Sequence, residues 1–371
     1  MLKNKYAIWI TALTFLLVAI GMVMIYSASS YVAKINFGDS FFFVKKQFFG
    51  LIMGIVTFSC ALIIKPTTLD KFRWVIMGVA LLLMGLVFVP GLGVESYGAK
   101  RWINLGFTTI QPSEIAKFAL VIFISGYIKD KKCDKWRVIL NVLISGGAVA
   151  LLLLLEPNMS ITICVVGVTV TMLIVGGIKF KQLFLLAIPL IVGAVALIVL
   201  EPYRLERLMA FIDPWQSPKD EGYQLIQSYY AIGSGGLFGV GLFNSRQKYL
   251  FLPFAESDFI FSVICEETGF VGCVFVLTLF FLLIFFGIKI AINANTAFEC
   301  YLAVGICAVI ALQTLINVAV VSGSIPPTGV PLPYISSGGS ALSVFMFASG
   351  LLVNLSRNKE YSRFRAFSHN M

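Results

Sequence analysis

A carboxyl group lies where a polar segment of the chain meets a long apolar run. Asp258 ends the polar segment, and Glu266 and Glu267 follow inside the run. A carboxyl group at a low-dielectric boundary has a raised pKa and can act as a general base near neutral pH. Glu266 is about 12 Å further along a helix than Asp258. The alternatives are that Asp258 caps its helix, and that the glutamates bond only to neighbouring helices.

Histidine and cysteine usage narrows the chemistry. The only histidine, His369, lies in the terminal tail, so a Ser-His-Asp triad and a His-ligated zinc site are nearly excluded. The cysteine count of 7 is odd, and most of these residues lie inside apolar runs, which argues against a disulfide framework or a C-x-x-C metal site. Proton chemistry must therefore fall to carboxylates, Lys, Tyr or water.

Basic side chains in the polar motifs could neutralise a developing negative charge. Arg101 stands beside Trp102, a pairing that suits a phosphate or a lipid headgroup. The candidate substrate-binding residues of these motifs are Lys100, Arg101, Arg204, Arg207, Gln224, Arg246 and Lys248.

A further polar cluster opens an apolar segment at Gln111. Pro112 fits the first turn of a helix, and Glu114 in that turn complements the helix dipole. Lys117 lies three residues further on the same face. One interpretation is a buried ion pair that fixes helix register. The other is the lining of a polar cavity, formed by Gln111, Ser113, Glu114 and Lys117 together.

The last polar motif opens the final apolar segment. It contains the candidate substrate-binding residues Ser336, Gly338, Gly339 and Ser340. Free backbone N–H groups at a helix start attract anions such as phosphate. A rigid re-entrant turn is the alternative.

The elements that position these residues are transmembrane helices. The chain is 59% hydrophobic and 12% charged, whereas soluble proteins are usually about 25% charged. Its apolar runs are continuous and close to the length that crosses a bilayer as a helix. We expect an all-α polytopic protein with about ten spans, near 7–27, 46–64, 72–90, 112–128, 137–155, 158–177, 181–200, 258–287, 299–322 and 338–355.

Basic residues give the expected orientation. Most Lys and Arg residues fall in alternate connections, so the positive-inside rule places both termini in the cytoplasm and the polar motifs outside. The net charge of +10 is mostly this topology signal, and a nucleic-acid partner is not expected. We expect one transmembrane domain over 1–371, with an ordered extracytoplasmic loop at 201–257.

Five motifs, in this order, resemble the SEDS family of cell-wall proteins (shape, elongation, division and sporulation). They are Gly98–Asn104 with Gln111–Lys117, Glu156-Pro157-Asn158, Arg204 to Gly241, Leu252–Gly269 and Pro326–Ser340. The similarity covers essentially the whole chain. The stretch from Asn244 to Pro253 is more similar to the FtsW/SpoVE branch than to the RodA branch.

The resemblance implies a ten-helix fold and peptidoglycan glycosyltransferase activity. It implies lipid II, a disaccharide-pentapeptide on undecaprenyl pyrophosphate, as substrate, and a class B penicillin-binding protein (transpeptidase) with other divisome or sporulation wall-synthesis proteins as partners. The family's catalytic aspartate falls on Asp258. The family's usual Pro-Glu-x-His-Thr-Asp-Phe is altered here, since Phe254, Glu256 and Ser257 replace Glu, His and Thr. Asn158 and Ser337 replace a frequent Asp and a frequent Tyr.

The expected reaction is one inverting displacement at the outer face of the bacterial cytoplasmic membrane. Asp258 would serve as base, and basic residues or a divalent cation (Mg²⁺ or Mn²⁺) would neutralise the pyrophosphate. A lipid II flippase is the main alternative, but no clear internal repeat is visible and the polar motifs lie toward one side. A scaffold that only recruits the transpeptidase would not need a carboxylate at the membrane boundary.

Overall fold

The computed structural model describes residues 2–357 except 97–98, 105, 107–108, 132, 200–201 and 221. The side chains of 2–4, 95–96, 99, 194–198 and 202–204 are also outside the description. Gly98 and His369, both named above, therefore lie outside the described residues.

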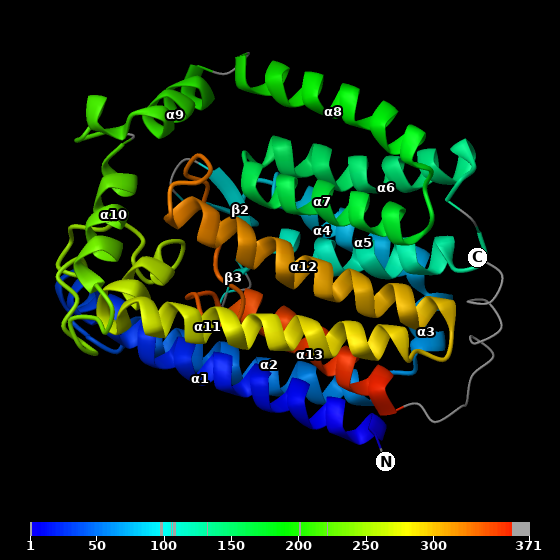
Figure 1. The fold of residues 1–371 in the computed structure, drawn as a ribbon, viewed down its shortest axis with the longest axis horizontal. Helices are drawn as coiled ribbons and strands as arrows, with labels where there is room; N and C mark the ends of the chain where they lie inside the picture. The colour runs from blue at the N-terminus through cyan, green and yellow to red at the C-terminus, as the bar shows by residue number, and fades with distance from the viewer. Residues whose placement is uncertain are drawn as a thin grey trace.

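Ten helices of the described chain coincide with the ten predicted spans (Figure 1). Six of them are long and apolar enough to cross a membrane, and α4, α7 and the first part of α8 are shorter apolar helices. Their bounds are α1 Leu2–Phe37, α2 Phe42–Ile63, α4 Arg73–Leu86, α5 Pro112–Ile128, α6 Trp136–Leu155, α7 Met159–Val175, α8 Phe180–Val199, α11 Ile260–Ile292, α12 Ala297–Val321 and α13 Gly339–Arg357.

The connections predicted to share the inner side lie at one end of the bundle. The short helix α3 (Pro66–Lys71) meets the end of α5 there, because Asp70 bonds both Arg73 and Lys129. The Asn354 amide near the end of α13 donates to the carbonyl oxygens of Ala61 and Ile64 at the end of α2, at 2.7 and 2.6 Å. Figure 1 shows this end on the right, with the start of α1 beside it.

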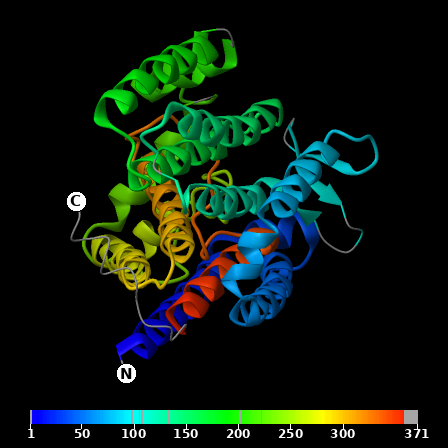
Figure 2. The ribbon, with the colours of Figure 1, turned by 90° about the vertical axis from the view of Figure 1, so that its right-hand side faces the viewer.

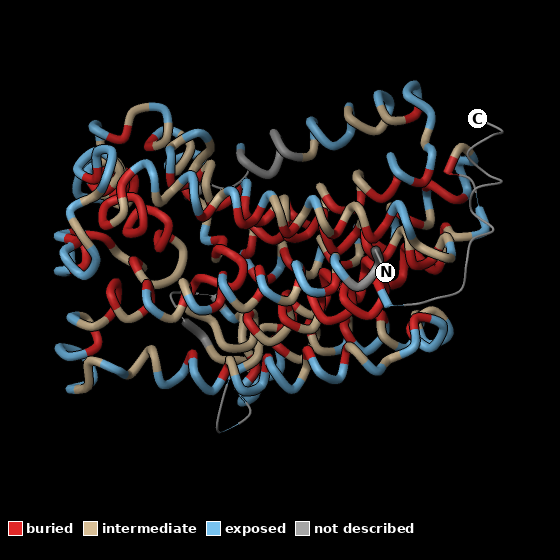
Figure 3. Tube along the Cα trace, turned by 60° about the horizontal axis from the view of Figure 1, so that its bottom comes forward, coloured by how far each residue is buried: buried red, intermediate tan, exposed pale blue. Residues whose placement is uncertain are grey.

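Helices α5 and α12 form the centre of the bundle, and α8 lies at its edge. Figures 1 and 2 show α8 apart from the other helices, beyond α6 and α7. Its side chains Phe180, Phe184 and Ile191 are exposed, and Figure 3 shows the buried residues gathered in the middle of the molecule. Apolar exposure of this kind matches a helix whose outer face meets lipid.

Glycines let α2 and α13 approach closely. A Cβ atom on Gly50 would lie 2.4 Å from the Cα atom of Gly339, so a larger residue would push the two helices apart. Gln47 of α2 reinforces the contact, since its Oε1 accepts from the Gly338 N–H at 2.9 Å and its amide nitrogen donates to the Ser336 carbonyl at 3.3 Å. The start of α13 is therefore fixed against α2.

The opposite end carries irregular structure. A three-stranded antiparallel sheet, β1 Gly93–Ser96, β2 Ala99–Asn104 and β3 Thr109–Ile110, precedes α5, and Ile103 pairs with Ile110. The predicted 201–257 loop folds in part into α9 (Pro202–Ile212), a 3₁₀ turn (Pro214–Gln216) and α10 (Tyr223–Gly235). Helix α10 packs against the bundle, since Ser228 bonds the Ser262 hydroxyl and the Val321 carbonyl.

Helix α11 is kinked at Gly269, which has a φ of 66°. The glycine-rich turn after α10 fills the break. The amides of Val240 and Gly241 donate to the carbonyls of Glu266 and Glu267, both at 3.0 Å. The glycines of this turn therefore permit a close backbone approach.

Candidate active site

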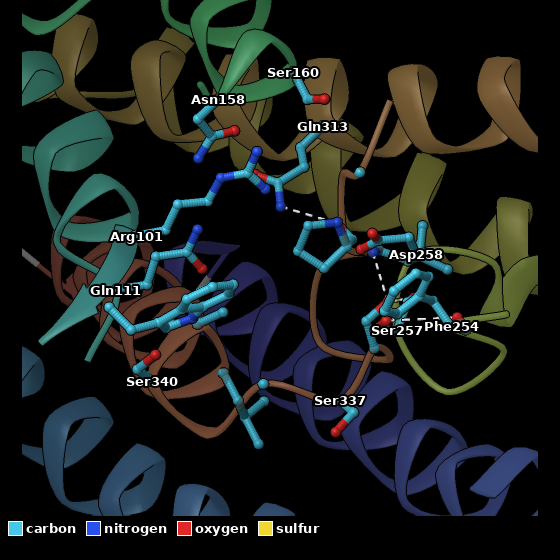
Figure 4. A pocket seen from close by; sticks show the side chains of 18 of the residues that line it. Arg101, Gln111, Asn158, Ser160, Phe254, Ser257, Asp258, Gln313, Ser337 and Ser340 are labelled. Carbon is cyan, nitrogen blue, oxygen red and sulfur yellow. Dashed lines mark hydrogen bonds between the residues drawn. The ribbon is translucent and has the colours of Figure 1, made fainter. Parts of the chain in front are cut away.

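The polar motifs surround one large cavity of about 1870 Å³ at the irregular end of the bundle. Its walls come from α2, β2 and β3, the corner between α6 and α7, α9 and α10, the segment before α11, the connection from α12 to α13 and the first part of α13. Figure 4 shows Arg101, Gln111, Asn158 and Asp258 around this space. Segments far apart in the sequence thus meet in one site.

Asp258 lies on the cavity wall just before α11. The N-cap of that helix is Phe259, which forms no side-chain cap bond, so the interpretation of Asp258 as a cap is wrong. The carbonyl of Asp258 accepts from the Asn317 amide at 2.8 Å. Oδ2 of Asp258 faces Gly329, where a Cβ atom would lie only 2.7 Å away. The carboxyl group is therefore half-buried in a space that a glycine keeps open.

The residues around Asp258 are tied to the connection between α12 and α13. The Ser336 hydroxyl donates to the Ser257 carbonyl at 2.6 Å, and the Ser337 N–H donates to the Glu256 carbonyl at 2.9 Å. The second amide hydrogen of Asn317 goes to the Val330 carbonyl at 2.6 Å. These bonds fix the position of Asp258 without using its carboxyl group.

Burial raises the pKa of Asp258 to about 6. Arg101 opposes this rise, Glu256 adds to it, and Arg207 lowers the pKa again. Most Asp258 side chains are then ionised at neutral pH, yet the group remains basic enough to accept a proton.

Two arginines approach the cavity from different elements. Arg101 of β2 donates through Nε to the Glu156 carbonyl at 3.3 Å and through Nη2 to the Pro157 carbonyl. Arg207 of α9 donates to the Pro327 carbonyl at 3.3 Å. Both guanidinium groups line the cavity with Asp258, and Lys45 and Lys46 of α2 line it as well. A carboxylate and four basic side chains of the described residues therefore face the same space.

The cavity brings together about half of the residues predicted for the site. The predicted residues that line it are Arg101, Gln111, Arg207, Gln224, Asp258, Ser336, Gly338, Gly339 and Ser340. Helix α13 begins at Gly339, as the Ser-Gly-Gly-Ser motif indicated. The predicted residues whose described side chains lie elsewhere are Lys100, Ser113, Glu114, Lys117, Arg246, Lys248 and Glu266, and the Arg204 side chain is outside the described residues.

Glu114 and Lys117 form the buried ion pair that was the alternative to a cavity lining. Lys117 Nζ lies 2.9 Å from Glu114 Oε2 and also donates to Gln313 of α12, with both charged side chains fully enclosed. The ammonium group further lies 5.2 Å from the ring centre of Phe345. Lys117 therefore joins α5 to α12, behind the cavity wall rather than in it.

Glu266 and Lys248 bond to the protein away from the cavity. Glu266 is buried and accepts from the Ser245 hydroxyl at 2.5 Å and from the Arg246 N–H at 2.9 Å. Lys248 is 6% exposed, and its ammonium group donates to the Phe243 carbonyl. Glu267 accepts from Ser27 of α1 at 2.5 Å. The two glutamates thus hold the loop around Ser245 to α1 and α11. The alternative interpretation, bonds to neighbouring helices only, describes the Ser27 contact but not the contacts with Ser245 and Arg246.

Sequence reasoning missed polar residues on the helical side of the cavity, namely Asn158, Ser160 and Gln313. Gln313 and Asn317 are isolated polar residues one helical turn apart in the apolar run of α12, and polar groups at that depth are usually functional or structural. Asn158 also caps α7, because its side chain accepts from the Ile161 N–H. The signal in the sequence is therefore the polar side chain inside an otherwise apolar run.

The described residues contain no group of three or more His, Cys, Asp or Glu side chains that could hold a metal ion. Asp258 is the carboxylate on the cavity wall. Mg²⁺ usually binds through one or two carboxylates, substrate phosphates and water. A cation here would therefore have to be held largely by phosphate oxygens of the substrate.

The fold and the site define a multi-pass α-helical membrane protein with a polar, cation-lined cavity at one end of its bundle. Residues 7–361 match the model of the FtsW/RodA/SpoVE family, described as cell cycle protein. The chain belongs to this family.

Relatives cover almost the whole chain. Stage V sporulation protein E of Bacillus subtilis (strain 168) is 37% identical, over 97% of this chain and 99% of that protein. The probable peptidoglycan glycosyltransferase FtsW of Geobacter sp. (strain M18) is also 37% identical, over 95% of this chain and 96% of that protein.

Solved structures share the fold. A chain of a peptidoglycan synthase complex that coordinates polymerization and crosslinking has a TM-score of 0.79 and 27% identity, over 94% of this chain and 96% of that chain. The rod shape determining protein RodA of Thermus thermophilus has a TM-score of 0.70 and 25% identity, over 95% of this chain and 97% of that chain. The resemblance inferred from the motifs is confirmed.

Proposed function

We propose that this protein is a peptidoglycan glycosyltransferase that polymerises lipid II into glycan strands and releases undecaprenyl pyrophosphate. The observation that carries the proposal is Asp258, the one carboxyl group among the described residues that line the large cavity, which Arg101 and Arg207 also line. The names of the FtsW relatives support the class of reaction.

Asp258 would take the proton of the GlcNAc 4-hydroxyl as that oxygen attacks the anomeric carbon of the growing chain. The bond to the pyrophosphate breaks, and undecaprenyl pyrophosphate leaves with the bonding electron pair. One displacement inverts an α-linked donor to a β-1,4 product, so a single base suffices. A pKa of about 6 leaves Asp258 mostly ionised and ready to accept that proton.

Arg101 and Arg207 would stabilise the leaving group. Pyrophosphate leaves without protonation when its charge is neutralised, and guanidinium groups match phosphate oxygens in geometry. A divalent cation, Mg²⁺ or Mn²⁺, would supply further charge neutralisation when bound to the pyrophosphate. Chelation should then slow polymerisation and added Mg²⁺ should restore it.

We also propose the cellular setting. The protein would lie in the bacterial cytoplasmic membrane with the cavity open to the extracytoplasmic side, where lipid II is consumed. A class B penicillin-binding protein would crosslink the strands, and other division or sporulation wall-synthesis proteins would join them. The structural likeness to a chain of a synthase complex supports such a partner.

The test is polymerisation of labelled lipid II in detergent by wild type, Asp258→Asn and Glu256→Gln, each with its cognate transpeptidase. Loss of a general base typically costs about 10²–10⁴-fold in rate. We expect that loss for Asp258→Asn and near wild-type strands for Glu256→Gln, a neighbouring carboxyl that does not line the cavity. No strands from folded wild type would favour a flippase, to be followed by a liposome flipping assay.

A further inference from the structure

Glu156 is a buried carboxyl group that the proposed reaction does not use. It follows the last residue of α6, and its side chain is 0% exposed. Neither carboxyl oxygen has a hydrogen-bond partner in the described part of the chain. Burial penalises the ionised carboxylate in such a place, so the neutral acid is favoured there near neutral pH.

Arg101 contacts the main chain at this corner. Its guanidinium donates to the carbonyl oxygens of Glu156 and Pro157, while the Glu156 carboxyl accepts no bond from any described residue. Arg101 also acts electrostatically on both Glu156 and Asp258. One arginine thus stands between a cavity carboxylate and a buried carboxyl group behind the wall.

The elements around the corner contribute few charges. Helix α5 offers Glu114 and Lys117, which neutralise each other. Helix α7 offers the thiol of Cys164, and the ionisable groups of α4 and α12, among them Arg73 and Glu299, lie toward the other end of these helices. Arg101 from β2 is the charge that lowers the pKa of Glu156, yet burial prevails and raises that pKa to about 8.

We propose that Glu156 is a positioning residue that is held neutral, so that Arg101 is anchored by main-chain carbonyls and keeps its positive charge for a diphosphate group in the cavity. An ionised Glu156 would accept from the guanidinium and cancel part of that charge. The proposal rests on the proposed function only in naming a diphosphate-bearing lipid as the anion. The proposal predicts that deprotonation of Glu156 at high pH weakens anion binding in the cavity.

The first measurement reads the proton directly. Infrared spectra of wild type should contain a protonated-carboxyl band near neutral pH that is missing in Glu156→Gln and fades as the pH rises through about 8. Glu256→Gln should keep the Glu156 band. A wild-type spectrum without any band dependent on Glu156 would overturn the proposal.

The second measurement is the pH dependence of anion binding. Binding of undecaprenyl diphosphate to wild type and to Glu256→Gln should weaken by about tenfold from pH 7 to pH 9, the value of one charge-assisted contact. Glu156→Gln should lack this decline and bind like wild type at the lower pH. Tighter binding by Glu156→Gln at the lower pH would mean that Glu156 is normally ionised and paired with Arg101, which contradicts the proposal.

These readouts are separate from catalysis. A wild-type protein that fails to polymerise lipid II but shows the band and the pH-dependent binding would sink the proposed function and leave this inference intact. An active wild-type protein whose infrared spectrum lacks the Glu156 band would support the proposed function and contradict this inference. If Glu156→Gln does not fold, Arg101→Gln should raise the pH at which the band fades, because the opposing cation is gone. An unchanged pH midpoint for the Glu156 band would contradict the electrostatic contact between Arg101 and Glu156.

Discussion

At the scale of single residues, the site depends on where one carboxyl group is placed. The Asn317 amide donates to the backbone carbonyl of Asp258, and the Ser336 hydroxyl donates to that of Ser257. Neither bond uses the carboxyl group, which faces the cavity. Its position before α11 was visible in the sequence. Its neighbours Arg101 and Gly329 come from distant segments, and only packing could identify them.

The polymerisation rate should depend on the ionisation of Asp258. The base must be deprotonated, so the rate should rise with pH and reach half its maximum near the pKa of about 6. Because Glu256 raises that pKa, Glu256→Gln should move the midpoint to lower pH. Initial rates at saturating lipid II across this range test the prediction, and a flat profile would exclude a base with this pKa.

The polymerisation rate should fall when a side chain is added at Gly329. In Gly329→Ala the new Cβ atom would lie 2.7 Å from Asp258 Oδ2, so the carboxyl group must move. We expect a loss of roughly tenfold or more in rate with little change in thermal stability, since misplacement by an ångström is costly. Gly233→Ala in α10 is the control, because a Cβ there meets nothing within 4 Å. Equal activity of both variants would show that the space beside Asp258 does not require a glycine at position 329.

At the scale of helices, polar contacts inside the bundle set how the elements meet. Gln313 accepts from Lys117 and donates to the Pro331 carbonyl at 2.9 Å, so α12 is joined both to α5 and to the cavity wall. The spacing of Glu114 and Lys117 predicted their pairing. It could not decide between a buried ion pair and a cavity lining, because that choice depends on how α12 and α13 pack against α5.

Breaking the α5 ion pair should cost stability before it costs chemistry. Lys117→Met leaves Glu114 as an uncompensated buried charge, and we expect about 3–5 kcal/mol of destabilisation. Adding Glu114→Leu should recover much of that loss, because two apolar side chains replace the pair. Thermal unfolding in detergent tests both variants. A double variant no more stable than Lys117→Met would argue that the charges have another role.

At the scale of the whole molecule, the bundle has two different ends. One end holds short turns and the basic cluster around Asp70, and the other holds the sheet, α9, α10 and the cavity. The positive-inside rule predicts that the end with the basic cluster faces the cytoplasm.

Labelling in intact cells should establish that sidedness. Lys219→Cys lies in an exposed turn near the cavity end, and Asp130→Cys lies in an exposed turn at the other end. A membrane-impermeant thiol reagent should label the first variant in intact cells and the second only after permeabilisation. The unsubstituted protein measures the background from its own cysteines. Labelling of Asp130→Cys alone in intact cells would mean that the topology is the reverse of the predicted one.

The sequence by itself determined the membrane class, the ten helical segments, the family and the position of Asp258 just before a long apolar helix. These follow from local patterns, since apolar run length, helix-start chemistry and motif order need no knowledge of neighbours. Only the tertiary structure decided that Arg101 and Arg207 share the cavity with Asp258, while Lys117, Lys248 and Glu266 bond inside the protein. The physical reason is that the enclosure of a polar side chain depends on partners from other helices, and a linear sequence does not specify which helices meet.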